Sequence, residues 1–371
     1  MNPAHLFEML KERGLHTWVG VPDSSLQPLL DLVLVAPQML HTVASNECEA
    51  IAIASGNYLA SGRPSVVYLQ NSGLGKTVHP LTSLYGSELA RIPMLMLVGW
   101  RGKLGGKPDE PQHQWMGRVT PQLLDLLQIP YRELEENNAA SVLPELFDLL
   151  KEGPAALLVP HQLLKSPDSS AAIENKSSFS WPLRWQIIEK VLDTLPSDTY
   201  FFSTTGKTSR ELFELRKKRS ETHARDFYCV GGMGTASSLA LGFSQIEKNK
   251  KICILDGDGA AWMQLGSWGS VIAARPENLV HLVIENNMHE STGGQPLSGD
   301  AKLLIKVARA LGYPICEEVE GLSQLEAFLK GLHRGPYYFQ VRSQSGSLPN
   351  LGRPDLSPAK NVELFLRERM K

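Results

Sequence analysis

The stretch that decides the fold is KICILDGDGA, residues 251–260. Its first half is an apolar run typical of a buried strand, and an acidic, glycine-rich turn follows directly. Open α/β sheets bind their ligands at the carboxyl ends of the strands. Glycines at such an end let backbone N–H groups approach phosphate oxygens, while Asp258 can hold a hard cation that bridges them. The stretch therefore predicts a phosphate and magnesium site.

A second polar strand end follows along the chain. The apolar run at residues 279–284 is followed by Glu285, Asn286, Asn287 and Met288. The separation of Asp258 and Asn286 fits one crossover between adjacent parallel strands, so two neighbouring strand ends can share one Mg²⁺. Two ordinary turns are the alternative interpretation.

The rest of the chain continues this alternation of strands and helices. A polar, serine-rich run at residues 166–180 has no periodicity and suits an exposed connection. We predict an α/β fold with two open, mostly parallel-sheet domains covered by helices, at residues 1–168 and 181–371, joined by a linker at 169–180. Further predicted strands are 17–21, 40–44, 65–69, 93–98, 155–159, 200–203 and 337–341, and predicted helices are 5–13, 25–33, 47–61 and 185–194.

Composition argues against several classes of protein. Lys plus Arg number 37 against 39 for Asp plus Glu, so the formal net charge of -2 gives no footprint for nucleic acid or anionic lipid. The apolar runs are shorter than the roughly 20 residues needed to cross a bilayer, and the first residues lack the order of a signal peptide. The 4 cysteines form no CxxC pair, which argues against a zinc site. We expect a cytoplasmic protein that binds neither nucleic acid nor membrane.

The two polar strand ends resemble the signature of the thiamine diphosphate (ThDP)-dependent enzyme family, in which GDG precedes an asparagine pair. The resemblance implies ThDP and Mg²⁺ as cofactors, a pyrimidine-binding (PYR) first domain and a diphosphate-binding (PP) second domain. It also implies Asp258, Asn286 and the backbone carbonyl of Met288 as metal ligands. The choice of Asn286 follows from an alignment in which Glu285 occupies the usual place of the first asparagine, and Asn287 is the fallback ligand.

Two further segments are similar to cofactor contacts of that family. At residues 230–234, Met233 would prop the cofactor into its bent shape, and the Gly231 carbonyl would accept a hydrogen bond from the aminopyrimidine. Residues 204–207 resemble the family's other diphosphate contact. The cofactor-binding residues that the resemblance implies are Glu47, Ser72, Gly73, Thr205, Gly206, Lys207, Gly231, Met233, Gly234, Gly257, Asp258, Gly259, Ala260 and Asn286.

Glu47 is the candidate for the carboxyl group that activates ThDP through its pyrimidine ring. The predicted strand at 40–44 ends there, Ser45 or Asn46 can cap a helix, and Glu47 opens a run rich in alanine and isoleucine. Burial raises the pKa of a carboxyl group and lets it share a proton with a weakly basic nitrogen. A simple partner for the helix dipole is the alternative, but the surrounding pattern resembles that of the family's activating glutamate. Glu49 is expected to be a solvated bystander.

Longer strings narrow the resemblance to the phosphonopyruvate decarboxylase family, which also lacks a middle domain. The resemblance implies decarboxylation of 3-phosphonopyruvate to phosphonoacetaldehyde and CO₂ in phosphonate biosynthesis, by a homo-oligomer whose active sites lie between chains. Sulfopyruvate decarboxylase is the near alternative, and a non-catalytic ThDP-fold subunit is a more remote one. The strings are GVPDS at 20–24, YLQNSGLG at 68–75, PLTSL at 80–84, DEPQH at 109–113 and HESTGGQ at 289–295.

An anionic substrate requires cationic or N–H-rich surroundings. The candidate cations are Arg101, Lys103, Lys76 and Lys207, and Lys76 and His79 replace residues that are asparagine in the family. The substrate-binding residues that the resemblance implies are Asp23, Ser24, Lys76, His113 and Glu290. His113 and His289 are candidate proton donors, catalytic beside Glu47, although a lone histidine is more often structural.

Overall fold

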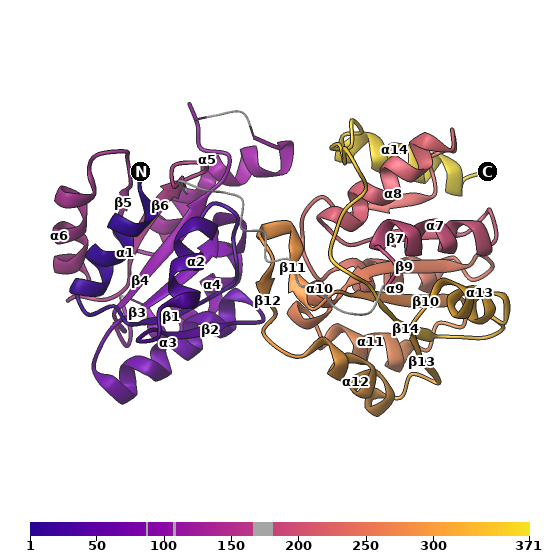
Figure 1. Cartoon of the computed structure of the whole chain (residues 1–371), viewed down its shortest axis with the longest axis horizontal. Coiled ribbons are helices and arrows are strands. Elements are labelled where there is room, and N and C mark those ends of the chain that lie inside the picture. The colour runs from indigo at the N-terminus through magenta and orange to yellow at the C-terminus, as the bar shows by residue number, and fades with distance from the viewer. Residues whose placement is uncertain (87, 107–108, 166–180) are drawn as a thin grey trace. The chain divides into compact units, whose positions relative to one another are not determined.

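The computed structural model describes residues 1–86, 88–106, 109–165 and 181–371, and these fall into two compact units (Figure 1). The first unit holds the described residues before position 166 together with Thr292–Ser298. The second holds those from position 181 onward without that segment. The predicted linker at 169–180 lies outside the described residues, so the position of the boundary stays a prediction.

The first unit is a six-stranded parallel sheet in the order β2-β1-β3-β4-β6-β5. Its strands are β1 (Thr17–Gly20), β2 (Leu40–Val43), β3 (Ser65–Gln70), β4 (Met94–Trp100), β5 (Tyr131–Glu133) and β6 (Ala155–Pro160). Its helices are α1 (Pro3–Glu12), α2 (Gln27–Val35), α3 (Glu47–Ser61), α4 (Leu74–Pro80), α5 (Pro111–Leu126) and α6 (Ala139–Leu149), with single turns η1 (Asn71–Gly73) and η2 (Leu81–Tyr85).

Alternate side chains of these strands enter two apolar cores. Val66 and Tyr68 of β3 pack into a core with residues of α1, α2 and α6, whereas Val67 and Leu69 pack into another with residues of α3. Both faces of the sheet are therefore buried, which explains why its central strands read as continuous apolar runs. Helix α2 begins later than predicted, because residues 23–26 form a turn in which the Ser25 N–H donates to the Asp23 carboxylate.

The second unit repeats this architecture, with sheet order β13-β14-β10-β9-β7-β8 and parallel pairing throughout the described pairs. The strands of this sheet are β7 (Tyr200–Ser203), β8 (Asp226–Tyr228), β9 (Ile252–Gly257), β10 (Leu279–Glu285), β13 (Ile315–Val319) and β14 (Tyr337–Arg342). The helices are α7 (Arg184–Thr194), α8 (Lys207–Lys218), α9 (Ala236–Ile246), α10 (Asp258–Met263), α11 (Ser267–Ala274), α12 (Leu304–Leu311), α13 (Leu322–Lys330) and α14 (Pro358–Arg369). Four short elements remain: β11 (Met288–His289), η3 (Glu290–Thr292), η4 (Ala301–Leu303) and β12 (Gln295–Pro296), of which β12 belongs to the first unit.

The predicted α/β class with two parallel-sheet units is confirmed. The register of the second sheet pairs Val283 with Asp256 and Ile284 with Gly257, so β9 and β10 end side by side as predicted. Among the described residues, none of the helices is long and apolar enough to span a membrane. The cytoplasmic location stays a prediction.

Candidate active site

The polar residues of the first unit follow the carboxyl ends of its strands. Asp23 follows β1, Glu47 follows β2, Gly73 follows β3, Arg101 follows β4 and His161 follows β6. Because neighbouring strands in this sheet are parallel, these ends share one edge. That edge is where such sheets bind ligands.

Glu47 is the first residue of α3 and is buried, with 6% of its surface exposed. A Cβ on Gly73 would clash with the Glu47 carboxylate, so the glycine at this position lets the β3 turn pass directly over the acid. Within the part of the chain that the structure describes, Glu47 Oε2 has no hydrogen-bond partner. Burial raises the pKa of Glu47, although the Lys76 ammonium 3.7 Å from Oε2 opposes the rise. The result is a buried carboxyl group prepared to hold a proton.

The neighbouring acid has a different environment. Asn46 caps α3 by accepting from the Glu49 N–H, and the Glu49 carboxylate accepts from the Ser45 N–H at 2.6 Å and the Ser45 hydroxyl at 2.5 Å. Glu49 is exposed, as predicted. Glu49 therefore stabilises the start of the helix from the surface, whereas Glu47 is buried.

Asp23 is the most deeply buried acid of the predicted substrate group. Its exposure is 0%, and Oδ2 accepts from the Ser25 N–H at 2.9 Å. No group among the described residues donates a hydrogen bond to Oδ1. Burial raises the pKa of Asp23 to about 6, even though the Arg101 charge lowers it. The Ser25 hydroxyl lies 3.0 Å from His161 Nδ1, which extends this polar group to the end of β6.

Arg101 and Lys103 are both paired with carboxylates. Arg101 Nε lies 2.8 Å from Asp109 Oδ2, and a second bond joins Nη2 to Asp109 Oδ1 at 2.5 Å. Arg101 Nη1 reaches the Ser24 hydroxyl at 3.4 Å, and Lys103 is ion-paired with Glu133. The prediction that these two cations are available to a substrate anion therefore gains no support from the structure.

The two candidate proton donors lie in different units and share one property. Burial lowers the pKa of His289 to about 4. Burial and the Arg101 charge lower the pKa of His113, against the opposing charge of Asp109. Both imidazoles are therefore held neutral at neutral pH, so the proton each can donate is that of a neutral ring N–H.

Asp258 is the centre of the predicted metal site in the second unit. It is 2% exposed and opens α10 directly after β9. Its Oδ1 accepts from the Gly259 N–H at 2.8 Å, and Oδ2 accepts from the N–H groups of Asn286 at 2.9 Å and Asn287 at 2.6 Å. Burial raises the pKa of Asp258 to about 7 despite these three donors. A cation beside this carboxylate would favour its ionised form.

The residues after β10 supply further oxygens next to Asp258. The Asn286 Oδ1 accepts from the Met288 N–H at 3.3 Å, and Asn287, with a left-handed φ of 59°, uses its Oδ1 to accept from the Ala301 N–H at 3.3 Å. The described residues contain no group of three or more His, Cys, Asp or Glu side chains that could hold a metal ion. A cation here would need amide, carbonyl and phosphate oxygens beside Asp258, which is the usual environment of Mg²⁺. The choice between Asn286 and Asn287 stays a prediction.

The predicted diphosphate contacts include glycines and a hydroxyl group at or after strand ends of the second unit. Gly206 has a φ of 94° and caps α8, and a Cβ there would approach the Ser291 hydroxyl to 2.6 Å. Gly231 has no heavy atom within 4 Å of its ideal Cβ position, and the nearest to Gly257 is Thr204 Cγ2 at 3.9 Å. The buried Thr204 hydroxyl lacks a hydrogen-bond partner among the residues that the structure covers. A buried hydroxyl without a hydrogen-bond partner, on a residue next to Gly257, fits a phosphate group.

The remaining predicted cofactor residues have the following places. Gly234 has a φ of 85°, and its Cβ position is 2.9 Å from the Ala260 carbonyl oxygen. Thr205 and Met233 are half-buried, and Gly259 and Ala260 are buried in α10. Ser72 is exposed in η1, where its hydroxyl accepts from the Gln70 amide at 2.7 Å.

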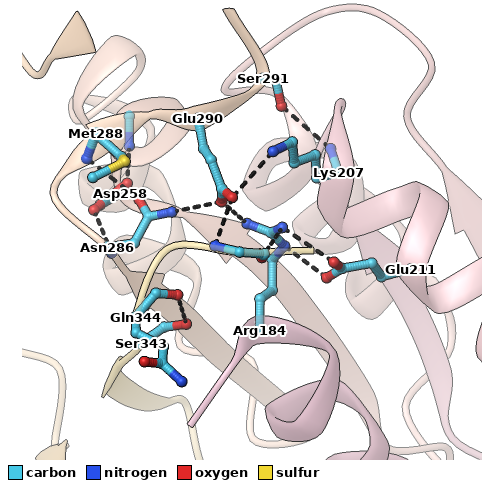
Figure 2. A network of polar contacts seen from close by, with 12 residues as sticks. Arg184, Lys207, Glu211, Asp258, Asn286, Met288, Glu290, Ser291, Ser343 and Gln344 are labelled. Atoms are coloured by element: carbon cyan, nitrogen blue, oxygen red, sulfur yellow. Dashed lines mark hydrogen bonds and ion pairs between the residues drawn. The ribbon is translucent and has the colours of Figure 1, made fainter. Parts of the chain in front are cut away.

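Glu290 is not free to contact a ligand in this structure. It accepts hydrogen bonds from Arg184, Lys207, Asn286 and the Gly346 N–H, at distances between 2.7 and 3.0 Å (Figure 2). Burial alone would raise the pKa of Glu290, but the charges of Arg184 and Lys207 outweigh it and lower the pKa. Lys207 and Glu290 form an ion pair with each other. The predicted roles of Glu290 in substrate binding and of Lys207 in cofactor binding therefore lack support.

Sequence analysis missed two residues that the structure brings into these groups. His161 follows the end of β6, and the strand-end rule applied to every strand would have found it. Arg184 gave no signal, because an arginine at the start of a helix is usually solvated.

Comparisons with known proteins were made for the whole chain. The model of the thiamine pyrophosphate enzyme N-terminal TPP binding domain matches residues 3–120, and that of the C-terminal TPP binding domain matches residues 204–341. The chain is 36% identical to a phosphonopyruvate decarboxylase of Streptomyces viridochromogenes, over 98% of this chain and 94% of that protein. It is 37% identical to the phosphonopyruvate decarboxylase of Streptomyces hygroscopicus, over 95% and 90% of the two chains. The sulfopyruvate decarboxylase subunit beta of Methanothermobacter thermautotrophicus is 29% identical over 50% of this chain and 94% of its own.

Proposed function

We propose, because the chain belongs to the thiamine pyrophosphate enzyme family and carries both of its TPP binding domains, that it decarboxylates 3-phosphonopyruvate to phosphonoacetaldehyde and CO₂. The observation that carries this proposal is the match to two phosphonopyruvate decarboxylases along nearly the whole of each chain. The match to a sulfopyruvate decarboxylase subunit covers half of the chain, which makes the sulfonate substrate the second candidate. The reaction is non-oxidative and would serve phosphonate biosynthesis.

The residues of the two units divide the cofactor chemistry between them. ThDP, when bound, supplies a nucleophilic carbon and a sink for the electrons that the departing carboxylate leaves behind. Glu47 would hold a proton at the pyrimidine, for which it is suited because it is buried and its Oε2 has no hydrogen-bond partner among the described residues. Asp258, Asn286 and the Met288 carbonyl would hold Mg²⁺, and the Thr204 hydroxyl and the nearby Gly257 would contact the diphosphate.

Asp23 suits a strongly anionic substrate in spite of its acidic side chain. An ionised carboxylate would repel the phosphonate and carboxylate groups of phosphonopyruvate. A carboxyl group whose pKa is already raised to about 6 takes up a proton readily when an anion approaches. Asp23 can then donate a hydrogen bond to the substrate, with the Ser24 hydroxyl and His113 as further polar contacts.

The test is an assay of purified protein with ThDP and Mg²⁺ against phosphonopyruvate, sulfopyruvate and pyruvate. We expect CO₂ and phosphonoacetaldehyde from the first, at a kcat/KM well above those for the other two. Glu47→Gln is the matched control, since it keeps the shape of the side chain and removes its acid chemistry. A preference for sulfopyruvate would show that the sulfonate, not the phosphonate, is the substrate. Full activity in Glu47→Gln would contradict the role proposed for Glu47.

We further propose a homo-oligomer of at least two chains, with each active site drawing on two of them. Glu47 and Asp258 belong to different units of the chain, and the proposed reaction requires both. Mixing an inactive Glu47→Gln protein with an inactive Asp258→Ala protein should restore part of the activity, because some sites then receive both native residues. A particle of 40.9 kDa in light scattering at assay concentration, or no recovery after subunit exchange, would contradict the proposal.

A further inference from the structure

A buried ion cluster lies beside the proposed metal ligands, and Arg184 is at its centre (Figure 2). Arg184 is the first residue of α7 and is 6% exposed. Its Nε and Nη2 bond Glu211 of α8 at 2.8 and 3.2 Å, and its Nη1 bonds Glu290 Oε2 at 2.7 Å. One guanidinium thus joins two acids that are far apart in the sequence.

Glu290 links Arg184 to Asn286 through hydrogen bonds. Its Oε2, which accepts from Arg184, also accepts from Asn286 Nδ2 at 2.9 Å. A carboxylate oxygen accepts only from the N–H side of an amide, so the Asn286 nitrogen must face Glu290. Figure 2 shows Asn286 between Glu290 and Asp258. Its Oδ1 is therefore turned to the other side, where the Met288 N–H donates to it at 3.3 Å.

We propose that Arg184, acting through Glu290, is a positioning residue that holds the Asn286 amide with its oxygen available to the metal ion. The inference rests on the proposed function, because it assumes a cation beside Asp258. The two ends of an amide have nearly the same shape, but only the oxygen can ligate Mg²⁺. An amide in the flipped orientation would place an N–H group against the cation.

The shape of arginine is needed at this position. A planar guanidinium can bond Glu211 on one edge and Glu290 on another, while Nη2 also reaches the Gly346 carbonyl at 3.3 Å. A lysine ammonium is a point charge and cannot span both acids in this geometry. Lys207, 3.0 Å from Glu290 Oε1, neutralises the acid on its other side but does not contact Glu211 through its ammonium group.

The segment that follows β14 holds the same cluster from the opposite direction. The Gly346 N–H donates to Glu290 Oε1 at 2.8 Å, and the Leu348 N–H donates to Glu211 Oε1 at 3.0 Å. Both acids therefore have fixed backbone donors beside Arg184. A support of this kind restricts Glu290 to one position, and that position sets the orientation of the Asn286 amide.

The experiment compares Arg184→Lys with Arg216→Lys. Arg216 is a matched control, because it makes a two-bond pair of 2.8 and 2.9 Å with the buried Asp226 in the same unit. None of the hydrogen bonds described for Arg216 reaches residues 286–290. Calorimetry measures the Mg²⁺ concentration that half-saturates ThDP binding, and thermal unfolding without cofactor measures stability.

We expect Arg184→Lys to raise the half-saturating Mg²⁺ concentration about 10-fold or more, as is typical when a partner of a metal ligand is lost. Arg216→Lys should leave that concentration unchanged. Both variants should lower the melting temperature by similar amounts. An unchanged Mg²⁺ requirement in Arg184→Lys, or an equal change in both variants, would overturn the inference. ThDP binding by the parent that ignores Mg²⁺ would overturn the metal site itself and the inference with it.

Glu290→Gln provides a second route if Arg184→Lys does not fold. Its amide can face Asn286 with either end, so the preferred orientation of Asn286 is lost and the Mg²⁺ requirement should rise as in Arg184→Lys. Where Arg184→Lys does fold, the double variant should need no more Mg²⁺ than the more impaired of the two single variants, because both act through one chain of contacts. Fully additive effects, or an unchanged Mg²⁺ requirement in Glu290→Gln, would contradict the proposed path.

Discussion

Asp23→Asn should stabilise the cofactor-free protein at neutral pH. Asp23 is fully buried, and burial raises its pKa from 3.8 to about 6. Between these two pH values the folded protein holds a proton that the unfolded chain has released. Stability therefore falls as the pH rises through this window, and above about pH 7 the full cost of the buried charge is present.

The size of the effect follows from the pKa. A rise from 3.8 to about 6 corresponds to about 3 kcal/mol of unfolding free energy. Asparagine has nearly the same shape and carries no charge, so Asp23→Asn should gain up to about 3 kcal/mol at pH 7.5. At pH 4 the aspartate is protonated in the folded state, and the difference between the two proteins should almost vanish. Activity should fall in the same variant, because a buried ionisable group kept at such a cost is typical of a functional site.

Hydrogen exchange of the amides in β1 and β3 measures this unfolding free energy for the first unit alone. Asp109→Asn is the control, because its pKa is lowered, chiefly by the Arg101 partner that outweighs burial, so removal of its charge should destabilise the unit at pH 7.5. The reasoning is refuted if Asp23→Asn is less stable than the parent at pH 7.5. It is also refuted if the gain is equal at both pH values, since a charge effect must depend on pH.

Three further results are expected. Glu47→Gln should keep cofactor affinity and lose about 100-fold or more in rate, with exchange of the thiazolium proton, followed by quenched NMR, slowed to match. Gly73→Ala should displace the Glu47 carboxylate and lower the rate similarly, whereas Gly75→Ala, with no atom within 4 Å of its Cβ position, should have no effect on single-turnover rates. Asp258→Ala and Asn286→Ala should each weaken ThDP binding in calorimetry by more than about 100-fold, and unchanged affinity in both would remove the metal assignment.

The sequence predicts the central strands well because they are buried on both faces. The structure adds β5, β8 and β13, which sequence analysis missed, and all three are edge strands of their sheets. Their sequences are YRE, DFY and ICEEV, short and partly charged, because an edge strand packs against fewer apolar neighbours. Hydrophobic periodicity therefore cannot distinguish them from loops.

The candidate site divides in the same way. Asp258 and Asn286 were predictable as neighbours, because a strand end fixes where the following residues lie. The pairing of Glu290 with Arg184 was not, because 106 residues separate them and nothing in either local sequence indicates the contact. For the same reason Arg101 and Lys103 were predicted as free cations, whereas the fold places Asp109 and Glu133 against them.

The contacts of the segment after β14 bear on the order in which the protein matures during synthesis. The loop at residues 286–290, which contains the proposed metal ligand Asn286, leaves the ribosome well before Gly346 and Leu348, whose N–H groups donate hydrogen bonds to Glu290 and Glu211. A nascent chain that stops short of these residues has Asp258 and Asn286 but not the backbone donors that fix their support. If the proposed metal site is right, we expect tight cofactor binding only after these residues are in place, so that truncated chains would bind the cofactor weakly.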